Sequence, residues 1–165
     1  MNKFKKDLAT GHKYEKKCLE YLDYDTVEHM KGYFKEYDLI ITKDGKKTKI
    51  EVKSDRQASI TGNMAIEYEC NKKPSGLTST QADYWIYFVV HKDTHDCYKI
   101  PTNELKDLVK NCRKVSGGDG YRSRMYLLKI KDCVKYKIKP LTDCNDSVEA
   151  TADLLQGLTM SDNKN

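Results

Sequence analysis

The sequence predicts a single mixed α/β domain over residues 1–142 and an acidic, partly disordered tail over residues 143–165. Three observations predict this class: helical apolar spacing near the N-terminus, an Asp44-Gly45 hairpin signal, and an almost wholly apolar run at residues 84–91. A chain of 165 residues is long enough for one domain with one core. The expected order of helices and strands along the chain is typical of a mixed α/β domain.

The first half of the chain predicts a helix followed by a hairpin. Apolar residues at helical spacing predict the helix over residues 3–23, and Glu15 lies on its apolar face. Residues 37–42 and 47–53 predict two antiparallel strands. The Asp-Gly pair between them favours a two-residue turn, because both of its positions need positive φ.

The rest of the chain predicts shorter elements. A glycine inside a strand pattern indicates a bulge, a threonine after a proline can cap a helix, and a continuous apolar run favours a strand buried on both faces. In chain order we expect a strand over 59–69 with a bulge at Gly62, a short helix over 78–83, a buried strand over 84–91, a strand over 95–100 paired with it, a helix over 103–112 capped by Thr102, a loop over 116–120, and strands over 124–130 and 133–139.

The net charge of +5 is unevenly distributed. The tail carries five acidic residues and one lysine, a charge of −4, so the first 142 residues carry +9. A basic body suits a polyanionic partner, since each lysine near a phosphate can release a condensed counterion. The alternative is that the lysines serve solubility alone.

Cysteine spacing and hydropathy bear on the compartment. The six cysteines form no CxxC pair and have no histidine at zinc-finger spacing, which indicates reduced thiols. No stretch approaches the roughly 18 apolar residues of a membrane span, and no secretory signal is recognisable. We therefore expect a cytoplasmic protein without a membrane partner, in the host cytoplasm if its source is a virus.

The hairpin gathers three charged side chains at one place. With Asp44-Gly45 as the turn, Lys43 pairs with Lys46, and extending this register sets Asp38 opposite Glu51. Opposite residues in an antiparallel pair share a face, with Cβ atoms about 5 Å apart. Lys53 points to the same face, because it is two residues beyond Glu51.

Two facing carboxylates repel each other unless a cation lies between them. Mg²⁺, with Mn²⁺ as its substitute, suits such a pair, because it takes one or two carboxylates and keeps several waters. Asp38, Glu51 and the Val52 carbonyl are the expected ligands. Such a metal can activate a water, while Lys53 orients that water or stabilises an oxyanion. The alternative is a surface hairpin with solvated charges.

These residues resemble a known family of nucleases. Asp38, followed after twelve residues by Glu51-Val52-Lys53, is similar to the motif of the PD-(D/E)XK superfamily, although Tyr37 stands where the motif has proline. The resemblance implies a restriction-endonuclease-like core, a mixed central sheet of about four to five strands flanked by helices. It also implies a Mg²⁺-dependent phosphodiester hydrolase acting on duplex or branched DNA.

The resemblance extends over roughly residues 10–90. Gly11, Tyr14 and Glu15 look like the first helix of Holliday junction resolvase-like members, which implies that Glu15 assists at the metal. Similarity to phage and viral members is carried by Glu51-Val52-Lys53-Ser54, Thr61-Gly62-Asn63 with Glu67, Pro74-Ser75-Gly76, and Ala82-Asp83-Tyr84-Trp85.

Several further residues are candidates with ordinary alternatives. Glu15 could instead pair with neighbouring lysines along its helix. Glu67 could approach the metal or be an outward-facing acid, and Gln81 could contact the substrate backbone, although a helix surface role is favoured. The candidate DNA contacts are Lys13, Lys49, Lys72, Lys73 and Ser75.

The sequence therefore predicts a metal-dependent DNA nuclease, an endonuclease or junction resolvase, which as a resolvase would act as a homodimer. A non-catalytic nucleic-acid-binding or scaffolding protein on the same fold is the alternative, since a basic body supports both. The sequence does not choose between endonuclease and exonuclease action.

Overall fold

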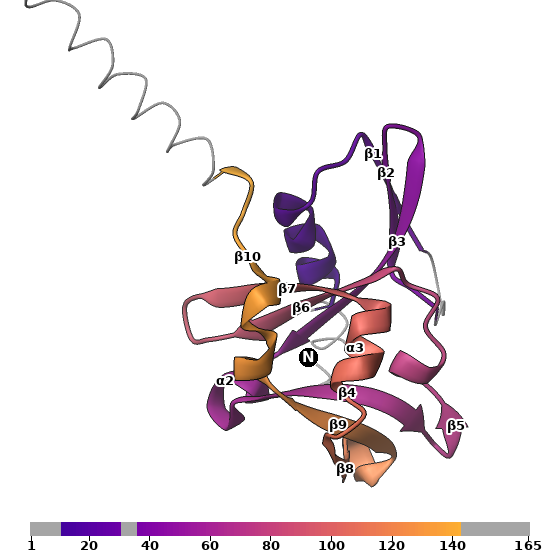
Figure 1. Cartoon of the computed structure of the whole chain (residues 1–165), viewed down its shortest axis with the longest axis vertical. Helices are drawn as coiled ribbons and strands as arrows, with labels where there is room; N and C mark the ends of the chain where they lie inside the picture. The colour runs from indigo at the N-terminus through magenta and orange to yellow at the C-terminus, as the bar shows by residue number, and fades with distance from the viewer. Residues whose placement is uncertain (1–10, 31–35, 143–165) are drawn as a thin grey trace, which may run out of the picture.

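The computed structural model describes residues 11–30 and 36–142. The expected acidic tail and the beginning of the first predicted helix lie outside the described residues. The described chain is a mixed α/β fold with few helices and two mostly antiparallel sheets (Figure 1). The mixed α/β class is confirmed; the strand count differs from the expected central sheet of about four to five, because six strands form the main sheet and four others form a second sheet.

The main sheet has six strands in the order β1-β2-β3-β6-β7-β10. Neighbouring strands are antiparallel except β3 and β6, which are parallel. The strands are β1 (Thr26–His29), β2 (Leu39–Lys43), β3 (Lys46–Asp55), β6 (Tyr84–Val90), β7 (His95–Pro101) and β10 (Lys137–Ile138).

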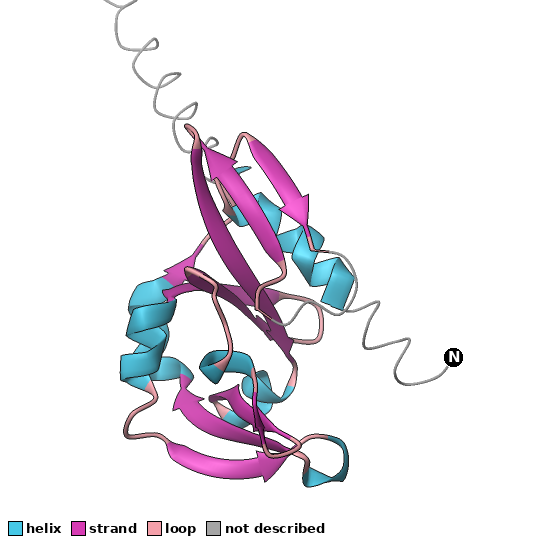
Figure 2. Cartoon of the chain, turned by 90° about the vertical axis from the view of Figure 1, so that its right-hand side faces the viewer, coloured by secondary structure: helices cyan, strands magenta, loops and turns pink. Residues whose placement is uncertain are grey.

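The second sheet is wholly antiparallel and has four strands in the order β5-β4-β9-β8. In Figure 2 its strands occupy the lower half of the molecule and those of the main sheet the upper half. The strands are β4 (Asn63–Cys70), β5 (Lys73–Pro74), β8 (Arg113–Gly117) and β9 (Ser123–Lys129).

The β2–β3 hairpin has the predicted turn and register. Asp44 and Gly45 both have positive φ, 49° and 74°, as a two-residue hairpin turn requires. The ladder runs from the pair Lys43–Lys46 to the pair Leu39–Ile50. Asp38 lies one residue beyond its end.

The main sheet is covered on both faces. The helix at residues 11–17 continues into η1 (Cys18–Tyr21) and packs on one face. The other face is covered by α3 (Thr102–Leu108), η4 (Ile130–Tyr136) and the second sheet. The side chains of β6 alternate between these two cores, which explains the apolar run and confirms a strand buried on both faces.

The strand expected over residues 59–69 begins later than predicted. A short helix, α2 (Gln57–Thr61), precedes β4, and Gly62 ends it in the left-handed conformation rather than forming a bulge. The Asp55 carboxylate accepts a hydrogen bond from the Ala58 N–H at 3.1 Å, which favours a turn over continued strand. The bulge of β4 lies between Glu67 and Glu69.

Other expected elements also differ. The helix expected over residues 78–83 is instead η2 (Gly76–Thr78). Thr102 does not cap α3 through its side chain, because its hydroxyl donates to the Ala82 carbonyl at 2.6 Å. Part of the expected loop over 116–120 is strand β8 and η3 (Asp119–Tyr121). Residues 130–136 form η4, where a strand over 133–139 was expected. Its buried residues, Cys133 and Tyr136, are three positions apart, which is the spacing of one turn of a 3₁₀ helix.

Gly76, the first residue of η2, allows the chain that leaves β5 to approach β4 closely. A Cβ at this position would lie 2.3 Å from the Glu67 carbonyl oxygen, and the φ of Gly76 is +49°. We expect Gly76→Ala to lower the free energy of unfolding by about 2 kcal/mol or more, because it combines a backbone clash with left-handed strain. Urea denaturation measures this.

Gly62→Ala is the matched control, because Gly62 has a φ of +71° but open space around it. Strain alone should lower the free energy of unfolding by about 1 kcal/mol there. Equal losses in the two variants would contradict the close approach at Gly76.

Candidate active site

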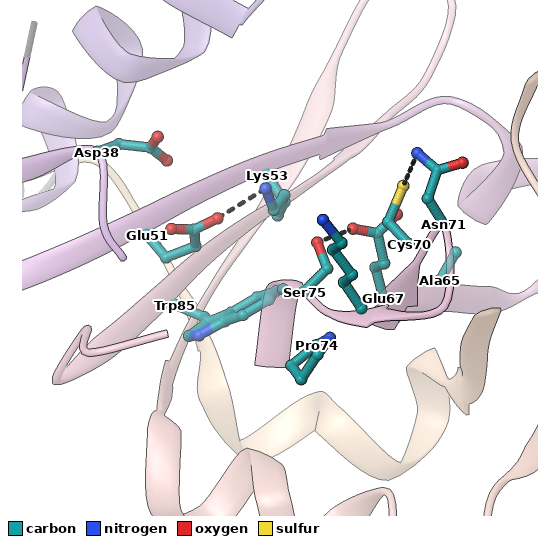
Figure 3. Close-up of a pocket in the computed structure, with 12 residues that line it drawn as sticks. Asp38, Glu51, Lys53, Ala65, Glu67, Cys70, Asn71, Pro74, Ser75 and Trp85 are labelled. Atoms are coloured by element: carbon teal, nitrogen blue, oxygen red, sulfur yellow. Dashed lines mark hydrogen bonds and ion pairs between the residues drawn. The ribbon is translucent and has the colours of Figure 1, made fainter. Parts of the chain in front are cut away.

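A cavity of about 660 Å³ opens between the main sheet and the segment that runs from β4 through β5 to the start of η2. Figure 3 shows Asp38, Glu51 and Lys53 on one side of it, with Glu67 and Ser75 on the other. It is lined by Asp38, Glu51, Lys53, Ala65, Glu67, Cys70, Asn71, Lys73, Pro74, Ser75, Gly76 and Trp85.

Asp38 is held against β3 by its backbone and its side chain. Its N–H donates to the Ile50 carbonyl and its carbonyl accepts from the Met30 N–H, both at 2.9 Å. Its Oδ2 accepts a hydrogen bond from the Val52 N–H at 2.7 Å. The β2–β3 ladder ends at Leu39, so the Asp38 carboxylate takes the position of the next strand partner for Val52.

Glu51 and Lys53 form a close ion pair beside Asp38. Glu51 is only 6% exposed, and its Oε1 lies 2.6 Å from the Lys53 Nζ. The ammonium also lies 5.8 Å from the centre of the Trp85 ring in the cavity wall. A buried carboxylate needs such a partner, because desolvation otherwise disfavours its charged form.

The cavity carries a surplus of negative charge. Burial first and the Glu51 charge second raise the pKa of Asp38 to about 6, although the Lys53 charge and the Val52 N–H oppose them. Burial lowers the pKa of Lys53, but the charges of Glu51, Asp38 and Glu67 outweigh burial and raise it. Lys53 is therefore protonated at neutral pH; it pairs with Glu51, and the charges of Asp38 and Glu67 act on it as well.

The Val52 carbonyl lies on the same edge of β3 as the Asp38 carboxylate. The N–H and C=O of a strand residue point the same way, and the Val52 N–H points to Asp38. Its side chain faces the opposite core. The geometry thus brings two carboxylates and a main-chain oxygen to the edge where β2 ends.

The second wall of the cavity comes from β4, from β5 and from Ser75, which precedes η2. Glu67 Oε1 accepts a hydrogen bond from the Ser75 hydroxyl at 2.6 Å, and Lys73 lines the wall beside them. Asn71 and Cys70 also line the cavity but were not predicted, because nothing in the sequence indicated that the second sheet would face the hairpin.

Glu15 lies outside the cavity lining. Its helix covers the opposite face of the main sheet, and its carboxylate lies 3.2 Å from His12 Nδ1 and 3.9 Å from His29 Nδ1. Its charge is close enough to contribute to the raised pKa of Asp38. Glu15 therefore influences the site through Asp38.

The remaining candidates are scattered around the site. Lys49 Nζ lies 3.4 Å from Gln81 Oε1 and 5.0 Å from the centre of the Tyr37 ring, outside the cavity lining. Gln81 lies beyond η2 rather than on a helix surface. Lys13 is exposed on the first helix, and Lys72 is exposed in the β4–β5 connection.

Within residues 11–30 and 36–142, no group of three or more His, Cys, Asp and Glu side chains is arranged to hold a metal ion. A cation at Asp38 and Glu51 would therefore have two side-chain ligands and depend on other oxygens. This donor set fits Mg²⁺, which keeps several waters, and does not fit a closed structural zinc site.

Comparisons of the chain with protein-family models, curated proteins and solved structures find no match. None of the helices in the described part of the chain is both long and apolar enough to cross a bilayer. The site's own chemistry therefore carries the functional argument.

The raised pKa of Asp38 predicts a pH-dependent cost in stability. The pKa is about 6 in the folded chain against 3.8 ordinarily, so the folded state holds the proton more tightly and loses stability as pH rises from about 4 to 6. Asp38→Asn keeps an acceptor for the Val52 N–H without the charge. In EDTA, its free energy of unfolding should exceed that of wild type by about 1–2 kcal/mol at pH 7, a value discounted for partial exposure.

Chemical denaturation across pH 4 to 8 measures this difference. Asp93→Asn, an exposed position between β6 and β7, is the control and should stay within about 0.5 kcal/mol of wild type throughout. If the free energies of unfolding of Asp38→Asn and wild type differed by the same amount at every pH, the proximity of two ionised carboxylates would be contradicted.

Proposed function

We propose that this chain is a Mg²⁺-dependent nuclease that hydrolyses DNA phosphodiester bonds as an endonuclease or junction resolvase. The observation that carries the proposal is one cavity in which three carboxylates, those of Asp38, Glu51 and Glu67, outnumber the two lysines, Lys53 and Lys73. Carboxylates held together against their repulsion are typical of sites that bind a cation or exchange protons.

The same observations support membership of the PD-(D/E)XK superfamily with a restriction-endonuclease-like core. Glu51 and Lys53 lie on β3 of the antiparallel β2–β3 hairpin, Asp38 directly precedes β2, and β3 has a parallel neighbour, β6. The spacing of Asp38, Glu51 and Lys53 along this hairpin is the spacing that resembles the family.

Asp38, Glu51 and the Val52 carbonyl would hold the Mg²⁺, or Mn²⁺ in its place. When bound, the metal would supply a more acidic water and charge compensation at the phosphate. Asp38 and Glu51 must both be ionised to bind it, so binding should improve as pH rises through about 6, the pKa of Asp38.

Lys53 would act as a hydrogen-bond donor and not as a general base. The neighbouring carboxylates raise its pKa, so its amine keeps its proton at neutral pH. From its position 2.6 Å from Glu51, the ammonium can donate to a phosphate oxygen or orient the attacking water. Glu15 would assist by its charge at Asp38.

DNA would enter over the basic rim of the cavity. Lys73 and Ser75 line its second wall, and Lys72 is exposed beside them. Their ammonium and hydroxyl groups suit phosphate oxygens, which fix the position of a duplex without reading its sequence. Lys49, on β3 with Glu51 and Lys53, would extend this contact, whereas Lys13 lies on the helix that covers the opposite face of the main sheet. A homodimer would be needed if the substrate is a junction.

The alternative is a nucleic-acid-binding protein that does not cut. The Lys53–Glu51 ion pair favours this non-cutting alternative. The Lys53 Nζ lies 2.6 Å from the Glu51 Oε1, so the lysine already neutralises Glu51 without a metal. A binder would shift DNA in a gel without nicking it, and EDTA would not alter the shift.

A nicking assay with plasmid, linear and branched DNA tests the proposal. We expect cleavage with Mg²⁺ or Mn²⁺ that EDTA abolishes. Glu51→Gln, Asp38→Asn and Lys53→Ala should each lower the rate by about 100-fold or more, because each removes a group that stabilises the transition state. DNA binding measured in EDTA should change by less than about threefold, since phosphate contacts elsewhere supply most affinity.

Lys92→Ala and Asp93→Asn are the controls, because both residues are exposed between β6 and β7 and lie outside the cavity lining. They should cleave at the wild-type rate. Undetectable cleavage by the wild-type protein on all three substrates would overturn the proposal, and a normal rate for Lys53→Ala would remove Lys53 from the mechanism.

A further inference from the structure

The hairpin between β8 and β9 presents an aromatic ring that the proposed active site does not use. Tyr121 at its tip is 79% exposed, and its φ of +54° is uncommon for a bulky residue. Its N–H donates to the Gly118 carbonyl at 3.2 Å, which ties the turn together. The ring therefore projects to solvent from a defined backbone position.

This tip adjoins the wall of the cavity. Ser123 pairs with Cys70, and the Asn71 N–H donates to the Arg122 carbonyl at 2.9 Å. Both Cys70 and Asn71 line the cavity. Tyr121 precedes Ser123 by two residues, a chain length of at most about 7 Å, so a strand leaving the cavity would meet the tip within a few nucleotides.

Cationic side chains flank the exposed ring. Arg122 is exposed at the tip, and Lys72 is exposed next to Asn71 on the adjoining connection. Arg124 is 57% exposed even though its Nε lies 3.3 Å from Glu69 Oε1. Arginines beside an exposed aromatic ring are suited to single-stranded nucleic acid, whose bases stack on the ring while its phosphates meet the cations.

We infer that the β8–β9 tip binds an unpaired segment of DNA, with Tyr121 stacked on a base and Arg122 and Arg124 at the phosphates. Bases inside a blunt duplex are stacked on each other and offer no free face, so the ring favours an overhang, flap or branch. The choice of DNA as ligand rests on the proposed function, and the inference adds the substrate class.

Binding of the full-length protein to fluorescent oligonucleotides in EDTA tests this inference without any cleavage. The probes are a single strand, a blunt duplex and the same duplex with a single-stranded overhang. Tyr121→Ala should weaken binding of the single strand and the overhang about fivefold or more and change blunt-duplex binding less than twofold. Tyr121→Phe should bind like wild type, because it keeps the ring.

Arg122→Ala should weaken binding of the single strand and the overhang, and reduce the slope of log K against log salt by about one for these two probes. Ile60→Ala and Arg56→Ala are the controls, since both residues are exposed near the other end of β4, and they should bind every probe like wild type. Unchanged single-strand binding by Tyr121→Ala, or an equal loss on the blunt duplex, would overturn the inference. If Tyr121→Ala selectively lost binding of the single strand and the overhang, but the wild-type protein never cut DNA, the proposed hydrolysis would be rejected and the inferred binding surface would stand.

Discussion

The hydrogen bond from the Val52 N–H to the Asp38 carboxylate, at 2.7 Å, is the constraint on which the candidate site depends. The backbone pairing of β2 with β3 ends at Leu39, and the Asp38 side chain accepts the next hydrogen bond from β3 in its place. Asp38 is thereby fixed beside Glu51 at the edge of β3, with the Val52 carbonyl on the same edge. Because backbone geometry makes this arrangement, the site does not depend on a flexible loop for its acidic groups.

This arrangement brings the carboxylates of Asp38 and Glu51 close enough to repel each other. Burial and the neighbouring Glu51 charge raise the pKa of Asp38 to about 6, while Lys53 already pairs with Glu51. A fold under selection for stability alone has no reason to keep this repulsion, and violations of local consistency concentrate at functional sites. Tyr121 is a second such position, because its ring is exposed on a strained backbone, and it is the residue we infer to bind single-stranded DNA.

Local signals in the sequence predicted the hairpin well. Asp44-Gly45 determines the turn, the turn determines the register, and the register brings Asp38 to Glu51. The second sheet was not predicted, because β4 pairs with β9, which follows more than fifty residues later, and no periodicity reports such a pairing. For the same reason the sequence could not predict that the tip at Tyr121 adjoins Asn71 in the cavity lining. Glu67 and Ser75 were candidates from the sequence, but their mutual hydrogen bond was not predicted.

The central claim is that Asp38 and Glu51 hold one divalent cation. Titration of the protein with Mn²⁺, followed by electron paramagnetic resonance, measures this directly. The account predicts one saturable Mn²⁺ site that Mg²⁺ displaces, with affinity reduced more than about tenfold in both Asp38→Asn and Glu51→Gln. Mn²⁺ binding that is absent from the wild-type protein, or that is unchanged in both variants, would contradict it.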